Sequence, residues 1–117
     1  MRSEELRVSP SHKYVINHVL SKFIGDPNID AVYLFGSCAA GVADGQSDID
    51  MFVVTNSAVN VDTHEAFALL YGCMDDVPFD KYVTCDILTA TRHEFDFDAT
   101  PLIRVVKREG VELRGLL

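Results

Sequence analysis

Two apolar segments joined by a glycine-punctuated connection constrain the fold of this chain more than any other feature of its sequence. The first, IDAVYLF, spans residues 29–35, and the second, IDMFVVT, spans residues 49–55. Short and nearly continuous apolar runs predict strands whose two faces are both covered by other parts of the protein. The connection, residues 36–47, is rich in glycine and alanine and has room for one short helical turn over residues 37–40. The sequence therefore predicts a strand–loop–strand unit within a sheet.

A helix is predicted before this unit. Ser9-Pro10 has the form of an N-cap followed by proline at the first helical position. An apolar stripe at helical spacing follows, and a turn at residues 25–28 ends the helix. The stripe consists of Val15, Ile16, Val19, Leu20 and Phe23. We therefore expect a helix between residue 10 and that turn.

Further helices and strands are predicted after the second apolar segment. Residues 62–65, Asp-Thr-His-Glu, have the pattern of a capping box and predict a helix start. Residues 81–89 are rich in β-forming side chains and predict a third strand. Residues 91–94 repeat the capping-box pattern, and residues 100–110, from Thr-Pro to Gly, predict the last helix. The core side of that helix carries Leu102, Ile103, Val105 and Val106. A short edge strand is expected at residues 111–113.

Helices that alternate with strands are typical of an α/β or α+β domain. For 117 residues, 48% of them hydrophobic, we expect a single domain spanning residues 1–117. No apolar run approaches the ~20 residues of a membrane span, and the amino terminus lacks an apolar signal-peptide core, so we expect a cytoplasmic protein. Three cysteines without paired zinc spacing fit reduced thiols. A net charge of −8 argues against general binding to nucleic acid or to anionic membranes.

Asp48 and Asp50 are unusual, because carboxylates beside an apolar strand are costly unless a positive charge neutralises them. Side chains two positions apart on a strand project from the same face, and their Cβ atoms lie roughly 7 Å apart. This separation suits two magnesium ions about 4 Å apart, each bound by carboxylate, phosphate and water oxygens. Acids at strand ends are also common on ordinary surfaces, so the pair alone leaves a surface role open.

Gly36 and Ser37 stand where the first strand ends and the short helical turn begins. Glycine lets the backbone approach a phosphate closely, free amides at a helix start attract the anion, and Ser37 adds a hydroxyl donor. Gly36 and Gly41 have the spacing of a Walker loop, but valine and alanine follow where lysine and serine or threonine are needed. The dinucleotide fingerprint G-x-G-x-x-G is also absent. Taken alone, Gly36-Ser37 is best interpreted as a plain turn.

Together these residues form the pattern G-S-x(10)-D-x-D between two predicted strands. The pattern resembles the signature of the nucleotidyltransferase superfamily typified by DNA polymerase β. The small size of the chain and its tail, IRVVKREGVELRG, are most similar to the minimal nucleotidyltransferases, which are usually encoded as antitoxins beside HEPN-domain toxins. The resemblance extends from residue 29 to about residue 115. It implies a polymerase β-like palm fold, with a small mixed sheet flanked by helices.

The resemblance also implies a third acid, on a neighbouring strand, that completes the metal site. Asp86 is the better match, because it stands five residues before Thr91, the capping residue of the next helix, which is the usual spacing in the family. Asp86 is also an acid within an apolar run, and strands that pair at about 4.8 Å can bring it to the same ions. Asp80, which follows Pro78-Phe79, is the alternative.

By this resemblance the chain is expected to be a metal-dependent nucleotidyltransferase that moves AMP from ATP onto a hydroxyl group. Gly36 and Ser37 would hold the triphosphate, and Asp48 and Asp50 would bind two Mg²⁺ ions, with Mn²⁺ as an alternative metal. Asp86 would complete the site of the ion beside the attacking hydroxyl. The acceptor would be a tyrosine of a HEPN-domain toxin, so the modification would silence an RNase. The chain would form a hetero-oligomer with that toxin or a homodimer.

The loop departs from the family pattern in one respect. Family members often carry G-S-R-A-R-G, whereas here Cys38-Ala39-Ala40 follow the serine, so two positive charges that could meet the triphosphate are absent. This departure favours a second hypothesis, an antitoxin of the same fold that blocks its toxin without catalysis. Transfer to a small molecule is a third hypothesis, although related enzymes of that kind usually carry an additional helical domain. Polymerisation on nucleic acid fits the acidic charge least.

Other polar residues receive no catalytic role from these patterns. Cys38 has no neighbouring histidine in sequence and is interpreted as a small filler of the loop. The four histidines lack paired ligand spacing and are interpreted as structural or exposed; they are His12, His18, His64 and His93. Arg104, Lys107 and Arg108 share one face of the last predicted helix. That face is either solvated and favourable to the helix C-terminus, or a docking surface for an anion or an acidic partner.

Overall fold

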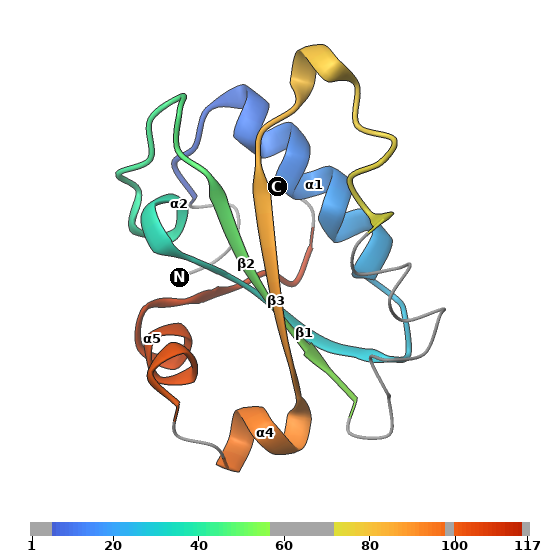
Figure 1. The fold of residues 1–117 in the computed structure, drawn as a ribbon, viewed down its shortest axis with the longest axis vertical. Helices are drawn as coiled ribbons and strands as arrows, with labels where there is room; N and C mark the ends of the chain where they lie inside the picture. Colours follow the sequence, from blue (N-terminus) through green and yellow to red (C-terminus); the bar gives the residue numbers. More distant parts are fainter. Residues whose placement is uncertain (1–5, 57–71, 98–99, 116–117) are drawn as a thin grey trace.

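Helices cover both faces of a small sheet in this protein (Figure 1). The structure is a computed structural model that describes residues 6–56, 72–97 and 100–115. Its elements in chain order are α1 (Pro10–Phe23), β1 (Ile29–Phe35), α2 (Gly36–Ala40), β2 (Ile49–Thr55), the 3₁₀ turn η2 (Phe79–Lys81), β3 (Cys85–Thr91), α4 (Arg92–Phe97), α5 (Pro101–Glu109) and β4 (Val111–Glu112). None of the described helices has the length and apolar character needed to cross a membrane.

The four described strands form one mixed sheet in the order β3-β2-β1-β4. β1 pairs antiparallel with both β2 and β4, whereas β2 and β3 run parallel. Parallel neighbours need a crossover connection rather than a tight hairpin, and here residues 56–84 connect β2 to β3. The expected small mixed sheet flanked by helices is confirmed, and its two central strands are the two apolar segments of the sequence.

The alternation of side chains along the central strands divides the core into two parts. On one face, Leu34, Met51 and Val53 pack with the apolar stripe of α1. On the other face, Phe52 and Val54 pack with buried residues of α4 and α5. Because both faces of β1 and β2 are covered, these strands are apolar at nearly every position, as the sequence indicates.

The predicted helix ends are present in the structure with their hydrogen bonds. Ser9 caps α1, its hydroxyl oxygen accepting from the backbone N–H of His12, and Thr100 caps α5 in the same way. At α4 the capping box is reciprocal: the Glu94 N–H donates to the Thr91 hydroxyl, and the Thr91 N–H donates to the Glu94 carboxylate. The short edge strand after α5 is also present and pairs with β1.

The third strand differs from its predicted boundaries. It spans Cys85–Thr91 rather than residues 81–89, because Phe79–Lys81 form a 3₁₀ turn after Pro78. At the other end, Thr91 pairs with Thr55 as the last residue of the strand while also capping α4. The helix predicted to start at residues 62–65 lies outside the described residues.

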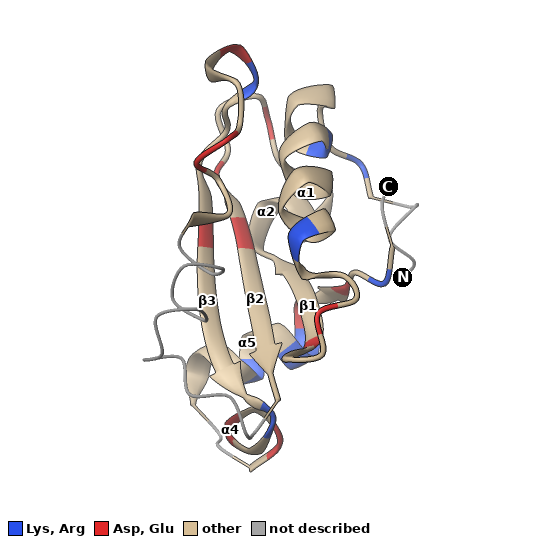
Figure 2. Cartoon of the chain, turned by 90° about the vertical axis from the view of Figure 1, so that its right-hand side faces the viewer, with Lys and Arg blue, Asp and Glu red and all other residues tan. Residues whose placement is uncertain are grey.

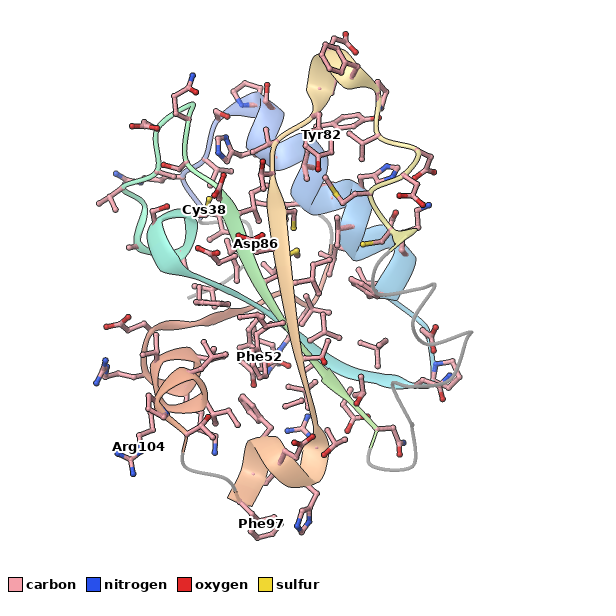
Figure 3. The ribbon with its side chains drawn as sticks, in the orientation of Figure 1. Cys38, Phe52, Tyr82, Asp86, Phe97 and Arg104 are labelled. Atoms are coloured by element: carbon pink, nitrogen blue, oxygen red, sulfur yellow. The ribbon has the colours of Figure 1, made fainter. Side chains whose placement is uncertain are left out.

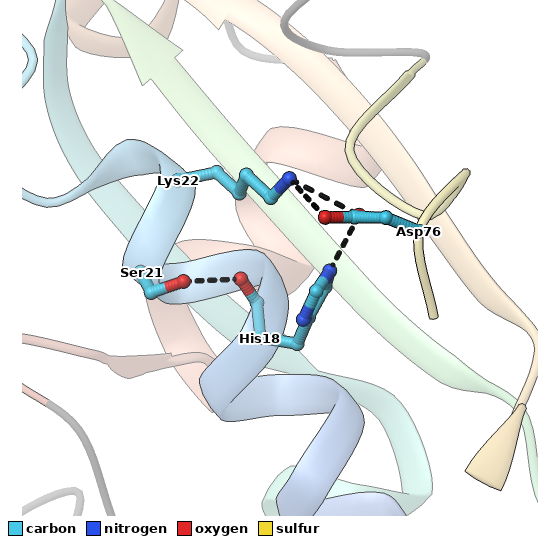
Figure 4. A network of polar contacts seen from close by, with 4 residues as sticks. All are labelled: His18, Ser21, Lys22 and Asp76. Atoms are coloured by element: carbon cyan, nitrogen blue, oxygen red, sulfur yellow. Dashed lines mark hydrogen bonds and ion pairs between the residues drawn. The ribbon is translucent and has the colours of Figure 1, made fainter. Parts of the chain in front are cut away.

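The segment before β3 is fastened to α1 by Asp76 (Figure 4). The Asp76 carboxylate accepts from Lys22 Nζ at 2.9 Å and from His18 Nε2 at 2.8 Å. These two hydrogen bonds lower the pKa of Asp76 to about 2. A few residues on, Lys81 Nζ lies 4.5 Å from the ring centroid of Tyr14 on α1. Both contacts place the residues that lead into β3 against the helix.

Candidate functional site

The turn from β1 into α2 brings glycine against a carboxylate. Gly36 has a φ of +73°, and a Cβ placed on it would lie 2.6 Å from Oδ2 of Asp50. The contact arises because Phe35, the last residue of β1, is the antiparallel partner of Asp50 on β2. A side chain at residue 36 would meet both the strain of a positive φ and a clash with Asp50, so only glycine fits there.

Asp50 and Asp86 lie opposite each other on neighbouring strands. The parallel register pairs Asp50 of β2 with Asp86 of β3, so both side chains are on the same face of the sheet. The acidic positions of the two strands lie side by side in Figure 2. Asp48 precedes β2 by one residue and is exposed. The structure therefore brings the three acids of the sequence pattern to one end of the sheet.

The acids lie just beyond the part of the sheet that α4 and α5 cover. Phe52, two residues after Asp50 on the same face, is 1% exposed and contacts Phe95 of α4, their ring centroids 5.8 Å apart. Figure 3 shows Phe52 farther along the sheet than Asp86, with Tyr82 beyond Asp86 at the opposite end. A buried core therefore supports the strands directly beside a carboxylate pair that solvent reaches.

In the part of the chain that the structure describes, no lysine or arginine compensates the charges of these acids. Burial, followed by the charges of Asp86 and Asp48, raises the pKa of Asp50 above its usual value. Among the described residues none of the three acids forms an ion pair with lysine or arginine. Within the same part of the chain no group of three metal-ligating side chains is already gathered around one point. The carboxylates repel one another and are not already arranged around one metal position, as expected for like charges without a cation between them.

This donor set fits a divalent cation. Hard carboxylate oxygens are the ligands that Mg²⁺ prefers, and one or two protein carboxylates together with substrate phosphates commonly hold it. A cation here would also relieve the repulsion from Asp86 and Asp48 that adds to burial in raising the pKa of Asp50. The absence of a side chain at Gly36 leaves backbone directly beside the Asp50 carboxylate, open to a ligand that approaches from that side.

A cleft of about 630 Å³ adjoins Asp50 and Asp86. Its walls are mainly apolar, and they include two partly exposed side chains, Tyr82 at 53% and Leu88 at 42%. The described residues that line it are Phe35, Asp50, Cys73, Met74, Asp75, Tyr82, Cys85, Asp86, Ile87 and Leu88. The described lining contains acids but no lysine or arginine. The cleft can therefore take a largely apolar group beside the carboxylates.

Within α2, Gly36–Ala40, Ser37 is the residue with a hydroxyl side chain. Cys38 is fully buried and Ala39 is 6% exposed, whereas Ser37 is half-buried. Burial and the charge of Asp50 raise the pKa of the Cys38 thiol, which disfavours the reactive thiolate. Its sulfur lies 3.7 Å from the Asp48 carbonyl oxygen. This placement agrees with the interpretation of Cys38 as a filler of the loop.

The rival acid lies elsewhere. Asp80 is exposed in the 3₁₀ turn and does not line the cleft that contains Asp50 and Asp86. In the paired register it is Asp86 that stands beside Asp50.

The sequence did not predict the cleft residues Tyr82 and Leu88, nor the contact between His12 and Ser47, the residue before Asp48. No local sequence signal marks the cleft or the histidine contact, because both join segments that are distant in sequence.

Comparison with known proteins gives a consistent result for the fold. The sequence profile of the family described as polymerase beta, nucleotidyltransferase matches residues 16–100. A solved structure described as a toxin–antitoxin with AMP-PNP is 24% identical with a TM-score of 0.56, over 92% of this chain and 74% of that chain. Two mutants of an MntA–HpeT toxin–antitoxin are each 22% identical with TM-scores of 0.53, over 88% and 89% of this chain and 72% of theirs. A comparison with curated proteins gives no significant match. At these identities the structural similarity concerns the fold.

Proposed function

The chain belongs to the polymerase beta nucleotidyltransferase family, and from that premise we propose that it transfers AMP from ATP onto a hydroxyl group. The observation that carries the proposal is the pairing of Asp50 with Asp86 across β2 and β3, directly beside Gly36. A cluster of carboxylates that form no ion pair with lysine or arginine among the described residues, next to an exposed backbone turn, suits the binding of metal and phosphate together.

Asp48, Asp50 and Asp86 would hold the metal, two Mg²⁺ ions or Mn²⁺ in their place. When bound, the metal neutralises charge on the transferred phosphate and on the pyrophosphate leaving group. Gly36 gives the phosphates access to the backbone, and the half-buried Ser37 offers a hydroxyl donor. Asp86 lines the cleft, where its carboxylate oxygen can accept the proton that the attacking hydroxyl gives up.

The proposed acceptor is a tyrosine of a HEPN-domain toxin, and the protein would act as its antitoxin in the cytoplasm. The cleft supports an aromatic acceptor, because Tyr82, Leu88 and Met74 offer apolar walls beside Asp86. The similar solved structures are described as toxin–antitoxin proteins, one of them with AMP-PNP. A partner of this kind would make the working assembly a hetero-oligomer.

One observation favours a second candidate, an antitoxin that binds its toxin without catalysis. Cys38, which is fully buried, and Ala40, which is exposed, stand where many family members carry loop arginines, and the described lining of the cleft contains no lysine or arginine. Without the two loop arginines, fewer protein cations are available to balance the negative charge of a triphosphate.

Mass spectrometry of the toxin distinguishes the two candidates. The proposed partner, a HEPN-domain toxin, is incubated with this chain, ATP and Mg²⁺, and we expect one tyrosine of the toxin to gain the mass of AMP. The control is the double variant Asp48→Asn with Asp50→Asn, which should still bind the toxin but leave its mass unchanged. A toxin that stays unmodified by the wild-type chain, while the double variant protects cells equally well, would support the binding antitoxin instead.

A further inference from the structure

A buried histidine, His12, contacts the residue that precedes the first acid of the candidate site. His12 is in the first turn of α1 and is 1% exposed. Together with Thr55 it is one of two buried polar side chains in the part of the chain that the structure describes. An imidazole buried without hydrogen bonds is costly, so the partners of its two ring nitrogens indicate what the residue holds in place.

Both ring nitrogens of His12 have partners. Nε2 lies 2.7 Å from the Ser47 carbonyl oxygen, and Nδ1 lies 2.5 Å from the Ser9 hydroxyl oxygen. Because a carbonyl oxygen only accepts, we assign the hydrogen to Nε2, which leaves Nδ1 of the neutral ring to accept from Ser9. The Ser9 oxygen itself accepts from the His12 backbone N–H at 3.2 Å. The ring is thus held in one orientation and joins the start of α1 to Ser47.

Ser47 directly precedes Asp48, the first acid of the site. A turn over residues 44–47 fixes the chain before Asp48. The Ser47 N–H donates to the Asp44 carbonyl, and the Asp44 N–H donates to the Ser47 hydroxyl. On the other side of Asp48, the Ile49 N–H donates to the Thr84 carbonyl at 2.8 Å. The Asp48 side chain is exposed and is not held by an ion pair among the described residues. Its position therefore depends on the backbone anchors at either side.

We propose that His12 is a positioning residue that fixes the Ser47 carbonyl and so holds Asp48 beside Asp50. The inference rests on the proposed function, since the expected effect is on metal held by these two acids. His12 does not line the cleft, so it acts through the backbone of Ser47 rather than on substrate.

Two substitutions of similar chemistry test this role. In His12→Asn the shorter amide can keep the contact with Ser9 but does not reach Ser47, whereas in His12→Gln the longer amide can donate to the Ser47 carbonyl. The affinity for Mn²⁺ alone is measured from the electron paramagnetic resonance signal of the free ion. Since partners outside the metal ligands commonly change metal affinity 10–100-fold, we expect about 10-fold weaker binding for His12→Asn and binding within about twofold of wild type for His12→Gln.

The wild-type protein is the reference that separates this inference from the proposed function. If wild type binds no Mn²⁺, both are overturned. If wild type binds Mn²⁺ and the two variants match it, or are weakened equally, the contact with Ser47 has no positioning role and the inference alone is overturned. Circular dichroism and thermal unfolding show whether each variant is folded at the temperature of the measurement.

A second pair of variants applies if His12→Asn does not fold. Ser9→Ala and Thr100→Ala each remove the N-cap of a helix and should destabilise the protein similarly, but only Ser9 contacts His12. We expect Ser9→Ala to weaken Mn²⁺ binding about threefold, less than the loss of a direct partner, and Thr100→Ala to leave it unchanged. Equal effects of the two variants would overturn the inference.

Discussion

Replacing Asp50 with asparagine should stabilise the metal-free protein at neutral pH while removing its response to magnesium. Asp50 is half-buried, it pairs with Asp86 in the sheet, and Asp48 adds a third negative charge. No lysine or arginine among the described residues forms an ion pair with them. The folded state therefore holds like charges close together, and the unfolded chain separates them.

The size of the effect follows from the spacing of the charges. For carboxylates about 6 Å apart on paired strands, the repulsion of one pair is about 0.7 kcal/mol in water and about 3 kcal/mol at an effective dielectric constant of about 20. Asp48 and Asp86 are exposed, so solvent screens their charges and the lower part of this range applies. We expect a gain of about 1 kcal/mol, which corresponds to an increase in Tm of about 4 °C for a domain of this size.

The pH dependence gives the prediction its sign. The pKa of Asp50 is raised in the folded state above the ordinary value of 3.8, so the folded state holds this proton more tightly than the unfolded state. The cost of the ionised group is therefore absent well below pH 3.8 and grows as pH rises through the folded pKa. The stability difference between Asp50→Asn and wild type should be present at pH 7 and vanish in acid.

Thermal unfolding with a chelator and then with Mg²⁺ measures these effects, with Asp80→Asn as the control because Asp80 is exposed and away from the cleft. Mg²⁺ should raise the Tm of wild type and of the control, by binding the folded state, but not that of Asp50→Asn. A loss of stability in metal-free Asp50→Asn at pH 7, or a difference that does not change with pH, would refute the reasoning.

Three further predictions follow from single residues. Gly36→Ala should lower the free energy of unfolding by about 1–2 kcal/mol and weaken nucleotide binding, because alanine meets a strained φ and the Asp50 carboxylate. The control Gly45→Ala, with open space around its Cβ, should change neither quantity. Chemical denaturation measures the stability and calorimetry the nucleotide binding. Asp86→Asn should reduce AMP transfer severely in a labelled-ATP assay whereas Asp80→Asn leaves it near wild type, and the reverse result would exchange their assignments. The contribution of Asp76, whose pKa is lowered, should be present above pH 3.8 and be lost as pH falls to about 2, so Asp76→Asn should remove that part of the acid transition seen by circular dichroism.

The local elements of the fold could be predicted from the sequence because their signals are local. The strands at residues 29–35 and 49–55 have the predicted bounds, since both are apolar runs ended by glycine or polar residues. The caps at Ser9 and Thr100 form their expected hydrogen bonds. The start of β3 was predicted wrongly. The residues between 81 and 85 are β-forming, but they follow the 3₁₀ turn after Pro78, and the strand begins only at Cys85.

The arrangement of the candidate site depended on information that one sequence pattern does not carry. The register that sets Asp86 opposite Asp50 joins strands separated by a long crossover, so spacing along the chain cannot determine it. The cleft beside Asp86 and the bond from His12 to Ser47 likewise join segments more than thirty residues apart or on different strands. The sequence could supply the chemistry of the acids, whereas tertiary contacts determine which groups surround them.

Isothermal titration calorimetry with ATP tests the central claim most directly, namely that the carboxylates at this end of the sheet bind nucleotide through a metal. The titration is made with Mg²⁺, with Mn²⁺ and with a chelator, and it is repeated on the folded double variant Asp48→Asn with Asp50→Asn. The account predicts detectable ATP binding by the wild-type protein with either metal, and none with the chelator or with the double variant. ATP binding of equal affinity with and without metal would contradict it.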